Sequence, residues 1–89
     1  MTMASSYNEF IHAKTRYALK MVEVFKTNVT QRKQAALLLS LLSRQFPLCR
    51  INFDLADCDK ILRVEGKNVL PSEIIGLLQA NGYQCQVLE

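Results

Sequence analysis

The chain has 89 residues, a length that fits one domain. Apolar residues make up 49% of it, which is too many for a disordered chain, and its net charge of +3 is far below that of a dedicated nucleic-acid binder. No apolar run approaches the roughly 18 residues that cross a bilayer, and the N-terminus lacks the apolar segment of a secretory signal. We therefore expect a cytoplasmic protein that makes no use of a membrane.

The first twenty residues predict a helical extension. Its apolar side chains fall roughly on one helical face: Tyr7, Phe10, Ile11 and Tyr17. The hydrophobic period changes to two at Met21, so residues 1–20 form the extension and residues 21–89 the domain. We expect the extension to dock its apolar face on the domain or on a second chain, because an isolated helix of this length is marginal in water. A disordered tail is the competing interpretation.

The first half of the domain predicts a strand, a helix and a strand. Apolar and polar side chains alternate over residues 49–55, and residues 21–25 also have a period of two. Between them, residues 31–45 carry an apolar stripe at helical spacing, which Pro47 ends.

The second half predicts the same units in the same order. Residues 60–65 form a strand that residues 66–68 end, and a helix then begins near Pro71. The left-handed stop Asn81-Gly82 ends this helix, and residues 83–87 alternate as a last strand.

This order of elements predicts an α+β sandwich of the ferredoxin-like type, with the extra helix at its N-terminus. Four antiparallel strands form one sheet, and two helices cover one of its faces. On the uncovered face we expect polar side chains with three apolar residues among them, Met21, Phe25 and Ile61. Together with Tyr7, Phe10 and Ile11 of the extension, these residues form the expected interaction surface.

Residues 21–88 resemble the heavy-metal-associated domains of copper chaperones and metal-pumping ATPases. The resemblance rests on the element lengths and on the second helix with its strand entry: Ser72-Glu73-Ile74-Ile75, Leu78 and Asn81-Gly82-Tyr83. That family carries Gly-Met-x-Cys-x-x-Cys after its first strand, where two thiolates bind one soft cation. The matching stretch here, residues 25–33, contains no cysteine. The resemblance therefore implies the fold, and we do not expect a bound metal or cofactor.

In this topology the turn between the second and third strands, the loop at residues 26–30 and the turn at Gly82-Tyr83 lie at the same end of the sheet. Two small sites follow from these loops. Cys58 lies in a turn between Asp57 and Asp59. Either its thiolate binds a soft metal, alone or shared by two chains, or it is an exposed thiol whose reactivity the flanking charges lower. The cations Lys26, Arg32 and Lys33 lie near the start of the first helix and form a candidate anion site.

These features favour a small non-enzymatic module that binds a protein partner or a second copy of itself. The sequence contains no catalytic triad, P-loop or second histidine beside His12. Nucleic-acid binding is not expected, because the third strand offers no aromatic side chain on which a base can stack. The alternative is a soft-metal carrier with an atypical site at Cys58.

Overall fold

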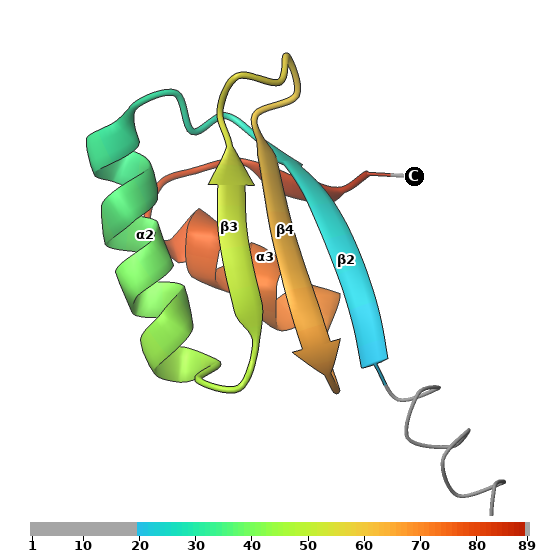
Figure 1. The fold of residues 1–89 in the computed structure, drawn as a ribbon. Coiled ribbons are helices and arrows are strands. Elements are labelled where there is room, and N and C mark those ends of the chain that lie inside the picture. The colour runs from blue at the N-terminus through green and yellow to red at the C-terminus, as the bar shows by residue number, and fades with distance from the viewer. Residues whose placement is uncertain (1–19, 89) are drawn as a thin grey trace, which may run out of the picture.

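The computed structural model describes residues 20–88, which form one four-stranded sheet and two helices. Figure 1 shows the helices on one face of the sheet. The elements are β2 (Lys20–Thr27), α2 (Arg32–Gln45), β3 (Arg50–Asp54), β4 (Ile61–Lys67), α3 (Pro71–Ala80) and β5 (Cys85–Val87). The strands are ordered β3-β4-β2-β5, and each neighbouring pair is antiparallel. The predicted α+β class, four-stranded sheet and two helices are confirmed, and the arrangement is compatible with a ferredoxin-like fold. The predicted N-terminal helix lies outside the described residues.

No helix within residues 20–88 has both the length and the apolar character that crossing a bilayer requires.

Helix α2 begins and ends where local chemistry satisfies its backbone. The side-chain oxygen of Gln34 accepts hydrogen bonds from the backbone N–H groups of Thr30 and Gln31, at 3.3 and 3.2 Å. These bonds fix the chain just before the helix, in the manner of a capping box. At the other end Pro47 follows the helix and prevents its continuation. The stripe predicted for this helix is confirmed at Ala35, Leu38 and Leu42, which are buried.

Helix α3 has the predicted proline at its start and glycine after its end. Pro71 occupies the first turn, where the missing N–H has no helical partner to lose. At the end, the side-chain amide of Asn81 donates to the carbonyl of Leu77 at 2.8 Å. Gly82 then takes a φ of 89°, a left-handed conformation that costs a residue without a Cβ little.

The core lies between the sheet and the two helices. Its fully buried side chains come from both layers: Phe25, Leu62 and Val64 from the strands, Leu38, Leu42, Ile74 and Leu78 from the helices, and Val29 from the loop after β2. A domain this small buries few large side chains, so the loss of any one of them is expected to remove a large part of the stability.

The structure corrects the prediction for the faces of β2. Phe25 was expected on the uncovered face, but it is 0% exposed and packs in the core beneath the helices. Side chains alternate along a strand, so Met21 and Glu23 share its side, and Val22 and Val24 point to the uncovered face. The physical reason is size: burying a phenyl ring removes more apolar surface from water than burying a valine.

The end of β4 also differs from the prediction. The strand was expected to stop at Gly66, but it continues to Lys67. A Cβ on Gly66 would lie 2.8 Å from the sulfur of Cys49 and 3.3 Å from its Cα. The glycine therefore serves the close packing of Cys49 against the sheet and does not break the strand.

We expect Leu42→Ala to lower the free energy of unfolding by about 2–5 kcal/mol, because it leaves a cavity among fully buried side chains. Leu37→Ala is the matched control on the same helix. Leu37 is 60% exposed, and its change should stay within about 0.5 kcal/mol. Urea unfolding followed by circular dichroism measures both. Equal losses for the two variants would contradict the orientation of α2.

We expect Gly66→Ala to cost about 1–3 kcal/mol, because the new methyl group overlaps Cys49. Adding Cys49→Ala should recover part of that loss, since it removes the closest atom. Gly76→Ala in α3 is the control: no atom lies within 4 Å of its Cβ position, so the helix should gain about 0.5–1 kcal/mol. The same urea measurement decides, and a Gly66→Ala variant as stable as the wild type would disprove the overlap.

Candidate functional site

Three loops meet at one end of the sheet, as the sequence predicted. We call this region, residues 28–31, 55–60 and 81–84, the loop end. The hydroxyl of Thr27 donates to the carbonyl of Lys60 at 2.6 Å and accepts from the N–H of Val29 at 3.2 Å. The side-chain oxygen of Asn28 accepts from the N–H of Gln84 at 2.8 Å. These bonds join all three loops, so polar groups of the loop end are used to hold its shape.

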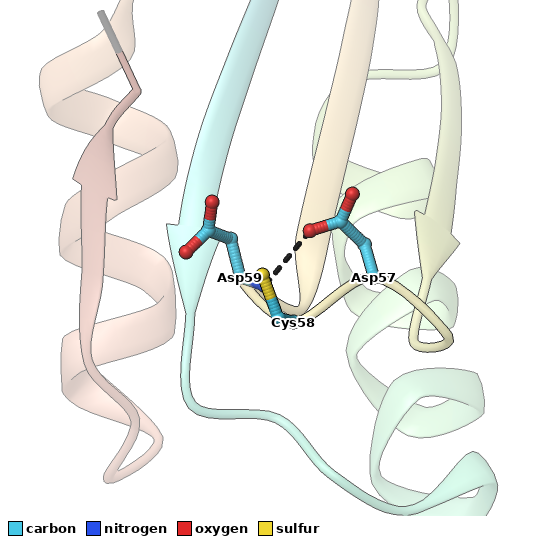
Figure 2. Close-up of side chains that lie close together, drawn as sticks. All are labelled: Asp57, Cys58 and Asp59. Carbon is cyan, nitrogen blue, oxygen red and sulfur yellow. Dashed lines mark hydrogen bonds between the residues drawn. The ribbon is translucent and has the colours of Figure 1, made fainter.

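The turn between β3 and β4 brings three possible metal ligands together. One ligand atom each from Asp57, Cys58 and Asp59 lies within 4.8 Å of the others. Figure 2 shows the sulfur of Cys58 between the two carboxylate side chains. The turn is closed by the N–H of Asp59, which donates to a carboxylate oxygen of Asp57 at 2.8 Å. Cys58 is exposed, as predicted for a turn thiol.

The chemistry of this turn does not match the soft-metal site of the resembled family. Soft cations select paired thiolates, and this turn offers one thiol with two hard carboxylates. Asp59 also lies 3.8 Å from the ammonium nitrogen of Lys26, which competes with a bound cation. A cation held here would need further ligands from another molecule.

The other two cysteines are packing residues. Cys85 is buried in the core, and burial raises the pKa of its thiol to about 11. The thiolate is the reactive form, so this cysteine is inert at neutral pH. Cys49 is half-buried beside Gly66. Cys85 therefore packs as a small apolar side chain, whereas Cys49 is only partly covered.

The three cations of the candidate anion site lie in different surroundings. Lys26 faces Asp59 and lines a shallow hollow with β5, whereas Arg32 lines a hollow between α2 and β3. Lys33 is exposed on the first turn of α2. Two of the backbone N–H groups before this helix already bind Gln34. The anion site stays a prediction that these contacts do not favour.

The face of the sheet away from α2 and α3 is a further candidate surface. We call it the open face; its central rows pair Lys26 and Asp54 with Ile61, Val24 and Asn52 with Arg63, and Val22 and Arg50 with Glu65. Within residues 20–88, no helix covers it. It carries both signs of charge around a short apolar strip.

The apolar residues of the open face differ from the predicted set. Ile61 lies on this face as expected, but it is only 6% exposed and sits between Lys26 and Asp54. Val22, 54% exposed, and Val24 take the place expected for Met21 and Phe25, which lie on the other side of β2. Lys26 shares their side of the strand, but Glu23 lies on the side of Phe25, so the charges of β2 alone do not identify the outward set. Tyr7, Phe10 and Ile11 lie outside the described residues.

A hollow of about 470 Å³ lies between α2 and the edge strand β3, and no expectation from the sequence included it. Its floor and walls are mainly apolar and include Ala35, Ala36, Leu39, Phe53 and Leu55. Two consecutive alanines on a helix otherwise rich in leucine are the only sequence signal for it.

A scan of protein-family models, a search of curated proteins and a search of solved structures each found no match to this chain. The resemblance to heavy-metal-associated domains therefore stays a prediction.

Proposed function

We propose that this chain is a small non-enzymatic binding module that contacts a protein partner through its open face. The observation that carries the proposal is the strip of exposed Val22 and half-buried Val24 beside rows of opposite charge, on a face that α2 and α3 leave uncovered. Apolar centres with charged surroundings are typical of protein interfaces. In this proposal the chain needs no cofactor and works in the cytoplasm.

The contacts of the loop end favour a protein-binding function over metal transport. In the resembled family this end holds the metal ligands. Here Thr27, Asn28 and Gln34 use their side chains to tie neighbouring backbone groups. A metal carrier needs ligands that can be exchanged, whereas these side chains are committed to the structure. We propose that the chain shares the fold of heavy-metal-associated domains but does not bind the soft metal ions that those domains carry.

The chemistry of the open face also favours protein over nucleic acid. Single-stranded RNA is read by stacking bases on aromatic side chains of a sheet. Phe25 is the aromatic residue of β2, and its ring points into the core. Asp54 and Glu65 interrupt the cations of the open face, Lys26, Arg50 and Arg63, so the face offers no continuous basic track for phosphate groups.

Quantitative affinity capture from native cells tests this function. Val22→Lys places a charge in the apolar strip opposite Glu65, which its cation attracts within the chain, and we expect it to reduce recovery of the partner at least about tenfold. Leu37→Lys is the matched control, because Leu37 is similarly exposed (60% against 54%) but lies on α2, away from the open face. Both variants should keep the urea midpoint near that of the wild type. A partner recovered equally with all three proteins would refute the open face as its binding site.

A second candidate function is metal binding at Asp57, Cys58 and Asp59, favoured by the proximity of their ligand atoms. We expect only weak binding by one chain, because the turn supplies a single thiol. Titration of the reduced protein with Cu(I) and Zn(II) against a competing chelator measures it. A one-to-one complex of submicromolar affinity that Cys58→Ser abolishes would replace the binding-module proposal with a metal carrier.

A further inference from the structure

The outer edge of β3 is an unpaired strand edge. β3 stands at the end of the strand order, and β4 is its one neighbour among residues 20–88. Its outward backbone N–H and C=O groups are therefore open to a further strand. Proteins commonly block such edges with a proline, a bulge or charges that repel a second copy. The five residues of β3 contain no proline.

The charges on β3 are complementary to a copy of themselves. The strand reads Arg50-Ile51-Asn52-Phe53-Asp54. When two copies pair antiparallel about Asn52, Arg50 of each copy faces Asp54 of the other. Ile51 likewise faces Phe53, and the two Asn52 side chains face each other. Every cross-strand pair is then favourable: two opposite-charge pairs, two apolar pairs and one amide pair.

The underside of β3 has room for such an approach. The side chains of Ala35 and Ala36 on α2 are small, and this leaves the hollow of about 470 Å³ beside β3. Phe53 and Leu39 line the hollow and are only half-buried. A strand added to β3 would cover the apolar wall of this hollow, which adds buried apolar area to the backbone hydrogen bonds.

We propose that two copies of this chain associate by antiparallel pairing of their β3 strands, with a two-fold axis at Asn52. The two sheets then form one continuous sheet, and each copy contributes the same patch, as a two-fold interface requires. The five-residue edge makes a small interface, so the dimer is weak and depends on concentration. The open face stays accessible in both copies, so this inference does not rest on the proposed function.

Charge exchange at the two ends of β3 tests the pairing on the full chain. Sedimentation equilibrium and light scattering should give a reversible monomer–dimer equilibrium for the wild type. Asp54→Arg leaves two cations at each end of the paired strands, and Arg50→Asp leaves two carboxylates. Each variant alone should raise the dissociation constant at least about tenfold. An equimolar mixture of the two variants should form a heterodimer again, because their charges are complementary.

Two further variants separate pairing from folding. Arg50 lies opposite Glu65 within the chain, so Arg50→Asp adds an internal repulsion. Asn52→Asp avoids this problem: it gains an attractive charge opposite Arg63 in its own chain, while it places two carboxylates together at the two-fold axis. It should therefore weaken the dimer and keep the urea midpoint. Glu73→Arg makes the same charge change as Asp54→Arg on α3 and should leave the dimer intact.

A wild-type chain that stays monomeric at every concentration would overturn the proposal. The edge of β3 would then be a candidate binding site for a peptide of another protein. Dimers of Asp54→Arg and Asn52→Asp as strong as the wild type would also overturn it, as would a mixture of the exchanged variants that does not associate.

Discussion

The position of the Thr27 hydroxyl decides how the strands and loops of this protein fit together. Thr27 is a buried polar residue, and a buried hydroxyl costs free energy unless it is hydrogen-bonded. The hydroxyl is satisfied on both counts, because it donates to the carbonyl of Lys60 and accepts from the N–H of Val29. Lys60 and Val29 belong to two different loops of the loop end. These bonds fix the side of the sheet on which Thr27 lies. Because side chains alternate, they also place Phe25 beneath the helices and the valines of β2 on the open face.

Much of the fold could be predicted because each element carries its own local signal. Pro71 and Asn81-Gly82 bracket α3, Pro47 follows α2, and the alternation of β3 agrees with its burial. The exposed position of Cys58 and its place at the loop end also followed from the order of elements. These are all properties of short stretches, in which the chain needs no information from distant residues.

The remainder could not be predicted because it depends on which distant residues meet. The apolar residues of β2 stand on both sides of the strand, so the packing of Phe25 against the helices and the hydrogen bond of Thr27 to distant Lys60 decide which side is buried. The local sequence predicts that Gly66 ends the strand. Its close approach to Cys49 is a tertiary contact, which the local sequence does not indicate. The hollow beside β3 similarly needs the spacing of α2 from the sheet, which two alanines alone do not give.

The short strand β5 has a consequence for how the chain folds. It pairs with β2 over three residues, and the bond between Gln84 and Asn28 joins positions 56 residues apart. Closing so long a loop costs chain entropy before any contact is formed, and three paired residues return little of it. The neighbouring strands β3 and β4 are joined by a tight turn and close their hairpin at much lower cost. We therefore expect the edge formed by β5 to dock late in folding and to open early in unfolding, so that the two edges of one sheet differ in lifetime.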